Sequence, residues 1–98
     1  MFDISTSNNE MVLTLTGSIT MENSLALKNQ LTGLDASKDL IIACPDLEYI
    51  DSSGVACLIL AYRARSKEGA KVILRSPSEA LTRVLDILKF TNLFEMEV

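Results

Sequence analysis

Hydrophobic and polar residues alternate near the start of the chain. Residues 11–16 place methionine and leucine at every second position, between valine and threonine, and this two-residue period is typical of a strand. Residues 2–6 form a second candidate strand, and the polar segment Ser7–Glu10 between the two has turn chemistry. The pattern predicts a β-hairpin.

A helical period follows Gly17, which breaks the strand pattern. From about Met21, leucines recur at the spacing of one helix face, and Gly33 stands near the expected end of that helix. These leucines are Leu27, Leu31 and Leu34.

The continuously apolar run LIIAC, residues 40–44, is too short for a free-standing helix and is typical of a strand covered on both faces. Pro45 ends it.

A second helix is predicted from about Val55 to the glycine at position 69. Its first turns are apolar on opposite sides, so we expect them to be buried or contacted by another molecule. Its polar residues gather at the far end: Arg63, Arg65, Ser66 and Lys67. We interpret these cations as a solvated helix end favoured by the dipole, with an anion site as the weaker alternative.

The last third of the chain predicts a strand, a helix and an edge strand. Residues 72–74 read as the strand. In Ser76-Pro77-Ser78-Glu79, Ser76 is the expected helix cap, proline takes the first helical position, and glutamate can reach back to the cap. Residues 94–98 alternate and predict the closing edge strand.

The order of elements predicts an α/β fold with a mixed β-sheet, covering α-helices and a single domain over residues 1–98. The chain has 98 residues, of which 48% are hydrophobic, which suits one compact core. The strand-helix-strand unit from Leu40 to Leu74 should be a right-handed parallel crossover. Functional groups gather where a strand's carboxyl end feeds a helix, and here that place is Asp51–Gly54.

Composition excludes several function classes. The net charge is −4 and the basic residues form no run, so no nucleic-acid partner and no direct membrane insertion are expected. The chain contains no histidine, and its two cysteines, Cys44 and Cys57, lie in apolar segments as expected of buried reduced thiols. We therefore expect a cytoplasmic protein that is not an enzyme and holds no metal or cofactor. Met11, Met21 and Met96 are interpreted as fillers of core gaps.

The segment IDSSG, residues 50–54, admits two interpretations. Aspartate and serine are good helix caps, so one of the polar residues caps the helix in either case. Three residues suited to capping stand where one would suffice. Gly54 lowers the stability of the helix, and its presence is easier to understand if another backbone or a bulky ligand must approach the helix closely at this position. A phosphate on Ser52 or Ser53 would be tolerated at a helix amino end, and its charge could repel a docked partner.

The element order, the glycine after the second strand, the IDSSG motif and the ending LDILKFTNLFEMEV resemble the STAS domain family. The similarity covers essentially the whole chain, and it is greatest to the short stand-alone members that act as anti-sigma factor antagonists. The resemblance implies a STAS-like mixed sheet. In that family the serine immediately after the aspartate is phosphorylated, which corresponds to Ser52.

The resemblance implies a partner-switching mechanism. The unphosphorylated protein would bind an anti-sigma factor that is also a serine kinase of the histidine-kinase-like ATPase type. Phosphorylation of Ser52 would dissociate the complex, and a serine phosphatase would reset it. The implied partner-binding residues are Asp51, Ser52, Ser53 and Gly54, with Ile19, Thr20 and Asn23 from the loop after the second strand.

The sequence also departs from the family pattern. The family commonly has Gly-Glu-Leu-Asp where this chain has Gly17-Ser18-Ile19-Thr20, so both acids are missing. Thr20 has an equally good alternative role as the cap of the first helix. A different function is also compatible with these changes: some STAS domains are accessory subunits of bacterial ABC lipid transporters and dock permanently on the ATPase through the same surface.

Overall fold

The computed structural model describes residues 2–7 and 10–97. Within them the chain forms a five-stranded sheet in the order β1-β2-β4-β6-β7, a two-stranded sheet of β3 and β5, and three α-helices. The strands are β1 (Phe2–Ser7), β2 (Glu10–Leu15), β3 (Gly17–Ile19), β4 (Leu40–Ala43), β5 (Leu47–Ile50), β6 (Val72–Arg75) and β7 (Glu95–Glu97). The helices are α1 (Ser24–Thr32), α2 (Ser52–Lys67) and α3 (Glu79–Leu88), and a 3-10 turn, η1, spans Thr91–Leu93.

The large sheet is mixed, as predicted. Strands β1 and β2 form the expected antiparallel hairpin, while β2, β4, β6 and β7 run parallel to one another. The apolar run at residues 40–44 supplies the central strand β4, and β7 is the expected edge strand. Asn8 and Asn9 of the predicted turn and Val98 at the end of the predicted edge strand lie outside the described residues.

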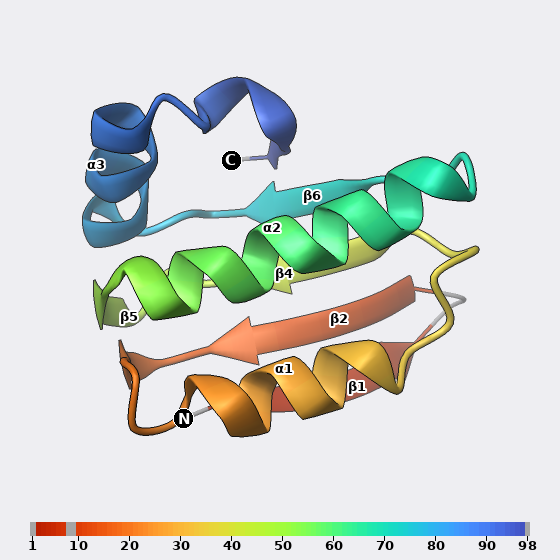
Figure 1. The fold of residues 1–98 in the computed structure, drawn as a ribbon, viewed down its shortest axis with the longest axis horizontal. Coiled ribbons are helices and arrows are strands. Elements are labelled where there is room, and N and C mark those ends of the chain that lie inside the picture. The colour runs from red at the N-terminus through yellow and green to blue at the C-terminus, as the bar shows by residue number, and fades with distance from the viewer. Residues whose placement is uncertain (1, 8–9, 98) are drawn as a thin grey trace.

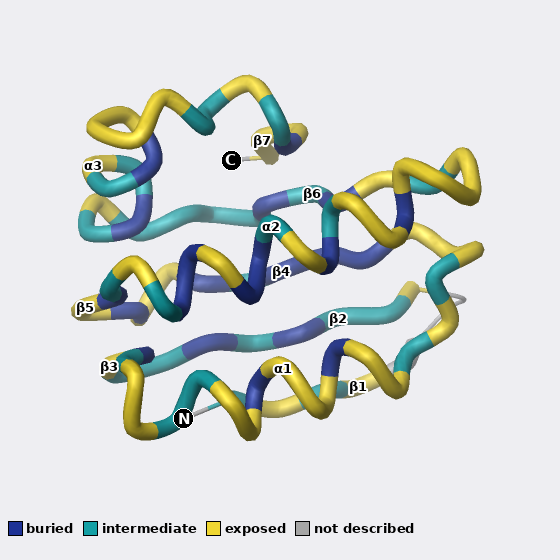
Figure 2. Tube along the Cα trace, viewed as in Figure 1, coloured by how far each residue is buried: buried dark blue, intermediate teal, exposed yellow. Residues whose placement is uncertain are grey.

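Helices α1 and α2 lie side by side across one face of the large sheet (Figure 1). Beneath them, Leu13, Ile42 and Leu74 sit in register on three neighbouring strands, and each is completely buried. The buried residues line the strands and the inner sides of the helices, as Figure 2 shows. This packing fixes the amino end of α2 at the edge of the sheet, beside the small sheet of β3 and β5.

Three predicted helix starts are wrong. Helix α2 begins at Ser52 instead of about Val55. Helix α1 begins at Ser24 instead of about Met21. Helix α3 is capped by Ser78, whose hydroxyl accepts a hydrogen bond from the Leu81 amide at 3.3 Å, and not by Ser76. Ser76 instead has a positive φ of 50° and donates its amide to the Glu97 carbonyl, so strand β7 holds it outside the helix.

Two surface predictions are also wrong. Arg65, expected to be solvated, is only 1% exposed, whereas Met21, expected to fill a core gap, is 76% exposed. Met96 is also exposed, at the edge of the sheet. Both cysteines are buried and free, as expected.

The burial of Cys44 gives the protein a pH-dependent stability. Desolvation raises the pKa of its thiol from an ordinary value of 9.0 to about 11. Between these values the folded state keeps a proton that the unfolded state has lost, so stability falls as pH rises through this window. We expect a loss of about 2 to 3 kcal/mol from Cys44 alone.

Urea denaturation at pH 8.5 to 11 measures this loss, with Cys44→Ala as the control that removes it while leaving lysine and tyrosine titration in place. The variant should show a shallower decline than the wild type over the same pH range. Parallel declines in the two proteins would contradict the prediction.

Candidate functional site

The amino end of α2 is built by Asp51, which follows β5 directly. Asp51 has an extended backbone and caps the helix: its Oδ1 accepts a hydrogen bond from the Gly54 amide at 3.1 Å. Its Oδ2 accepts a second hydrogen bond, also 3.1 Å long, from the amide of Met21, thirty residues earlier in the chain. One carboxylate therefore holds both the helix start and the loop between β3 and α1.

Ser52 is the first residue of α2 and is exposed to solvent. Its hydroxyl has no hydrogen-bond partner among the described residues, and the amide groups of Ser52 and Ser53 are likewise unpaired there. Unpaired amides are the usual state of a first helical turn. Ser53 is half-buried. Of the two hydroxyls, the one on Ser52 is the more accessible to an enzyme or a partner.

Gly54 and Ile19 lie beneath this surface, which corrects the expectation that they contact a partner directly. Both are buried. A Cβ atom added to Gly54 would stand 2.6 Å from Cγ1 of Ile50 and 2.8 Å from Cγ2 of Ile19. The close approach that the glycine suggested is therefore made by side chains of β3 and β5. These two residues shape the helix start from inside.

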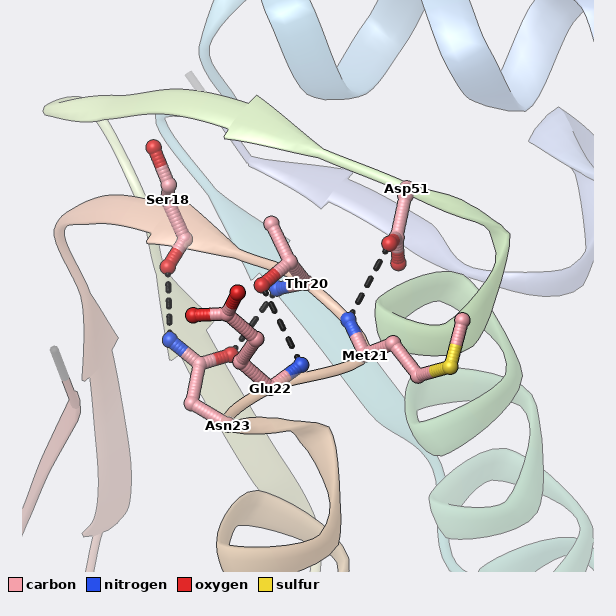
Figure 3. A pocket seen from close by; sticks show the side chains of 6 residues that line it. All are labelled: Ser18, Thr20, Met21, Glu22, Asn23 and Asp51. Atoms are coloured by element: carbon pink, nitrogen blue, oxygen red, sulfur yellow. Dashed lines mark hydrogen bonds between the residues drawn. The ribbon is translucent and has the colours of Figure 1, made fainter.

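The loop after β3 is held by its own polar groups (Figure 3). Asn23 accepts a hydrogen bond from the Thr20 amide through Oδ1 at 2.8 Å and donates one to the Ser18 carbonyl through Nδ2 at 2.9 Å. The Thr20 hydroxyl accepts the Glu22 amide at 3.3 Å, which resembles capping, although α1 begins only at Ser24. Thr20 and Asn23 are both half-buried, so the loop is fixed in place while remaining accessible.

This loop and Asp51 enclose an open surface pocket of about 740 Å³. It is lined by Ser18, Thr20, Met21, Glu22, Asn23 and Asp51, whose arrangement Figure 3 shows. The sequence prediction therefore brought together Asp51, Thr20 and Asn23 correctly. It missed Ser18, Met21 and Glu22. Their proximity to Asp51 depends on the pairing of β3 with β5, and the short pattern Leu47-Glu48-Tyr49-Ile50 was the one available signal of that pairing.

The described residues show neither a metal-binding cluster nor a membrane-spanning helix. No group of three or more cysteine, aspartate or glutamate side chains is placed to hold a metal ion in this part of the chain. None of its helices is both long and apolar enough to cross a bilayer. The chemistry available at the helix start is that of hydroxyls, amides and carboxylates.

Comparison with known proteins places the fold and the motif in one family. The family model described as "Mlab, STAS domain" matches residues 2–95. The chain belongs to the STAS domain family. This confirms the family suggested by the element order and the IDSSG motif.

This STAS domain has relatives among bacterial regulators. It is 25% identical, over 95 residues, to the anti-sigma-B factor antagonist of Bacillus subtilis, covering 96% of this chain and 87% of that protein. An anti-sigma factor antagonist from Mycobacterium paratuberculosis shares the fold with a TM-score of 0.82 and 22% identity, covering 99% of this chain and 84% of the other. The Bacillus cell fate determinant SpoIIAA in its phosphorylated form has a TM-score of 0.78 and 17% identity, covering 100% of this chain and 92% of the other.

Proposed function

We propose that this STAS domain is an anti-sigma factor antagonist that works by partner switching through Ser52. In its unmodified state it binds an anti-sigma factor that is also a serine kinase of the histidine-kinase-like ATPase type. The kinase phosphorylates Ser52 and is released, and a serine phosphatase restores the binding state. The observation that carries this proposal is the Ser52 hydroxyl, which is exposed at the amino end of a sixteen-residue helix and has no hydrogen-bond partner among the described residues.

The helix start suits a reversible phosphate. The positive end of the helix dipole favours negative charge there, as do the amides of Ser52 and Ser53, which are unpaired within the described part of the chain. Phosphorylation therefore need not disturb the fold. SpoIIAA, whose structure is known in an unphosphorylated and a phosphorylated form, is a protein of this fold that accepts the modification. The present chain shares that fold at 20% and 17% identity to the two structures.

The charge around Ser52 explains why a phosphate would release the partner. Asp51 and Glu22 already place two carboxylates on the pocket beside the helix start. A phosphate would add about −1.5 to −2 charges to this patch and impose repulsion on any acidic partner surface docked there. In the sequence, Glu22 is the first acid after Gly17-Ser18-Ile19-Thr20, the segment in which the two acids of the common family pattern are absent.

Each site residue then has a distinct role. Ser52 is the phosphorylated residue. Asp51 accepts hydrogen bonds from both the helix start and the loop, and in this way it positions the neighbouring Ser52 hydroxyl. Thr20 and Asn23 hold the loop against the partner, and Ser53 lies at the helix start beside Ser52. Two exposed apolar side chains can extend the contact surface: Met21, which lines the pocket, and Leu25 in the first turn of α1.

The alternative function, an accessory subunit docked on the ATPase of an ABC lipid transporter, uses the same surface without a phosphoserine cycle. The apolar side chains exposed on α1 and α2 are compatible with permanent docking as well. The two functions differ in the partner and in the fate of Ser52, and one experiment separates them.

The test captures partners from the native cell extract with the unmodified chain and then incubates the complex with ATP. We expect a serine kinase in the captured complex and one new phosphate on Ser52 in the mass spectrum of the chain. Ser52→Ala should abolish this phosphate and Ser53→Ala should keep it, because the Ser53 side chain is the less accessible. An ABC ATPase as partner with an unmodified Ser52 would overturn the proposal in favour of transport.

A further inference from the structure

The outer side of the two-helix layer carries an apolar ridge that nothing in the described chain covers. Helices α1 and α2 lie over one face of the large sheet, and no other described element lies over their outer side (Figure 1). Along α2, Ala56, Leu60 and Ala64 are exposed at intervals of four residues, and Leu60 is 45% exposed. Side chains four residues apart form one ridge of a helix surface. We call these three residues the α2 ridge.

A small hollow opens beside the α2 ridge. It measures about 180 Å³ and is lined by Leu60 and Ala64 of the ridge, together with Leu31 of α1 and Leu34 just after α1. A cavity of about 150 Å³ can hold one benzene molecule, so this hollow has room for one branched apolar side chain. Ridge and hollow together have the shape into which a second helix packs.

The two ends of α2 carry opposite charges. Asp51 and Glu22 line the pocket at the amino end of the helix. Arg63 and Lys67 are exposed near its carboxyl end, and neither forms an ion pair with a residue of the described chain. Glu68, the acid nearest to these cations in sequence, lies just after the helix. The accessible surface along α2 therefore runs from acidic to basic.

We propose that two copies of this chain associate through the α2 ridge, with their α2 helices packed antiparallel across a two-fold axis at Leu60. The ridge is symmetric about this residue, so Ala56 of each copy meets Ala64 of the other. Each Leu60 side chain enters the hollow of the facing copy. A two-fold interface requires such self-complementarity, because the same surface serves both copies.

Charge favours a second copy as the occupant of the ridge. Arg63 and Lys67 follow Leu60 by three and seven residues, which places them on the same side of the helix. Ser52 precedes Leu60 by eight residues, so Ser52 and Lys67 lie about 12 and 10 Å from the two-fold axis along the helix. The antiparallel arrangement therefore brings the cations of each copy to the acidic helix start of the other. A parallel arrangement would bring like charges together.

The association has a consequence for the Ser52 switch, and this consequence rests on the proposed function. In the dimer each Ser52 lies beside the cations of the second copy, so a phosphate on it gains charge-assisted contacts with Arg63 and Lys67. Phosphorylation then strengthens the dimer while it weakens the docking of the kinase. The dimer itself requires no kinase, so its test can fail or succeed independently of the proposed function.

Sedimentation equilibrium of the full chain, at concentrations from about 10 µM to about 1 mM, tests the association. We expect a monomer–dimer equilibrium with a dissociation constant of roughly 100 µM, because small interfaces are weak. Dilution of the ¹⁵N-labelled chain should shift the amide resonances of Ala56, Leu60 and Ala64 over the same range. A chain that stays monomeric at about 1 mM overturns the proposal, and so do dilution shifts confined to other elements.

Two leucine variants give a matched comparison. Leu60→Lys places like charges at the two-fold axis and should weaken the association by at least about tenfold. Leu88→Lys, on α3, changes a leucine of similar exposure, 39% against 45%, and should leave the association unchanged. Lysine is a good helix former, so neither variant should disturb its helix. Equal association of the two variants overturns the proposal, and the dilution shifts of the wild type decide even if a variant fails to fold.

Charge variants test the orientation of the two helices. Ser52→Asp adds an acid opposite the cations of the second copy and should strengthen the association by about threefold or more. Adding Lys67→Glu to the same chain should remove this gain, because it replaces an attractive pair by a repulsive one. A dimer that Ser52→Asp weakens would contradict the antiparallel arrangement.

Discussion

Replacing Ser52 by aspartate should weaken binding to the proposed partner, an anti-sigma factor kinase, by about 100-fold. The substitution adds a fixed negative charge to a surface that already carries Asp51 and Glu22. In the proposed mechanism this charge meets acidic groups of the partner, and like charges brought together across an interface cost several kcal/mol. The fold should be unaffected, because aspartate is favoured in the first turn of a helix. Titration calorimetry with the purified kinase measures the change.

The matched control is Ser52→Asn, which has nearly the same shape as the aspartate variant and no charge. It should bind within about threefold of the wild type, so a loss confined to aspartate identifies charge as the cause. The difference between the two variants should also shrink as salt is raised, because exposed charges are screened. Equal binding by the wild type and Ser52→Asp would contradict partner switching and favour permanent docking.

Strand pairs with a local signature were predictable from the sequence. The hairpin of β1 and β2 shows the two-residue period, and the central strand β4 shows a continuous apolar run, because each pattern reflects burial on defined faces. The strands β3 and β5 were missed. They have three and four residues and are stabilised by pairing with each other across about thirty positions of the chain, which leaves little trace in local sequence.

The misplaced cap of α3 has a similar cause. Ser76-Pro77-Ser78-Glu79 offers two serines, and propensity alone favoured the first because of its proline and glutamate. The structure uses the second, since the Ser76 amide is bound to the Glu97 carbonyl of β7 at 2.6 Å. A tertiary contact at the far end of the chain thus decides where this helix begins, and no pattern within four residues could show it.

The candidate site likewise contains residues that could be predicted from the sequence and residues that could not. The sequence predicted a capped helix start at the IDSSG motif, because a cap followed by an apolar helix is written in adjacent residues. It left open which residue is the cap, and the structure shows that it is Asp51. The contact of Met21 with Asp51 was not predictable, since it requires the loop after β3 to fold back onto α2. Arg65 likewise looked like part of a solvated helix end until packing against the end of α1 enclosed it.

Replacing Gly54 by alanine should destabilise the protein by about 1 to 3 kcal/mol, the usual cost of overpacking a core. In an ordinary helix the same change stabilises by up to about 1 kcal/mol. The sign reverses here because the new Cβ would stand 2.6 Å from Ile50 and 2.8 Å from Ile19, both buried in the core beneath the helix start. Urea denaturation of the two proteins measures the difference.

Gly33→Ala is the matched control, because its new Cβ would meet only ordinary contacts at 3.6 and 3.7 Å and its φ is −81°. This variant should be neutral or slightly more stable than the wild type. Adding Ile50→Ala to Gly54→Ala removes the closest clashing atoms, so the combined loss should be smaller than the sum of the separate losses. A Gly54→Ala protein as stable as Gly33→Ala would contradict the packing described here. The glycine of the motif would then have to be explained by the partner that docks on it, because the fold would not require it.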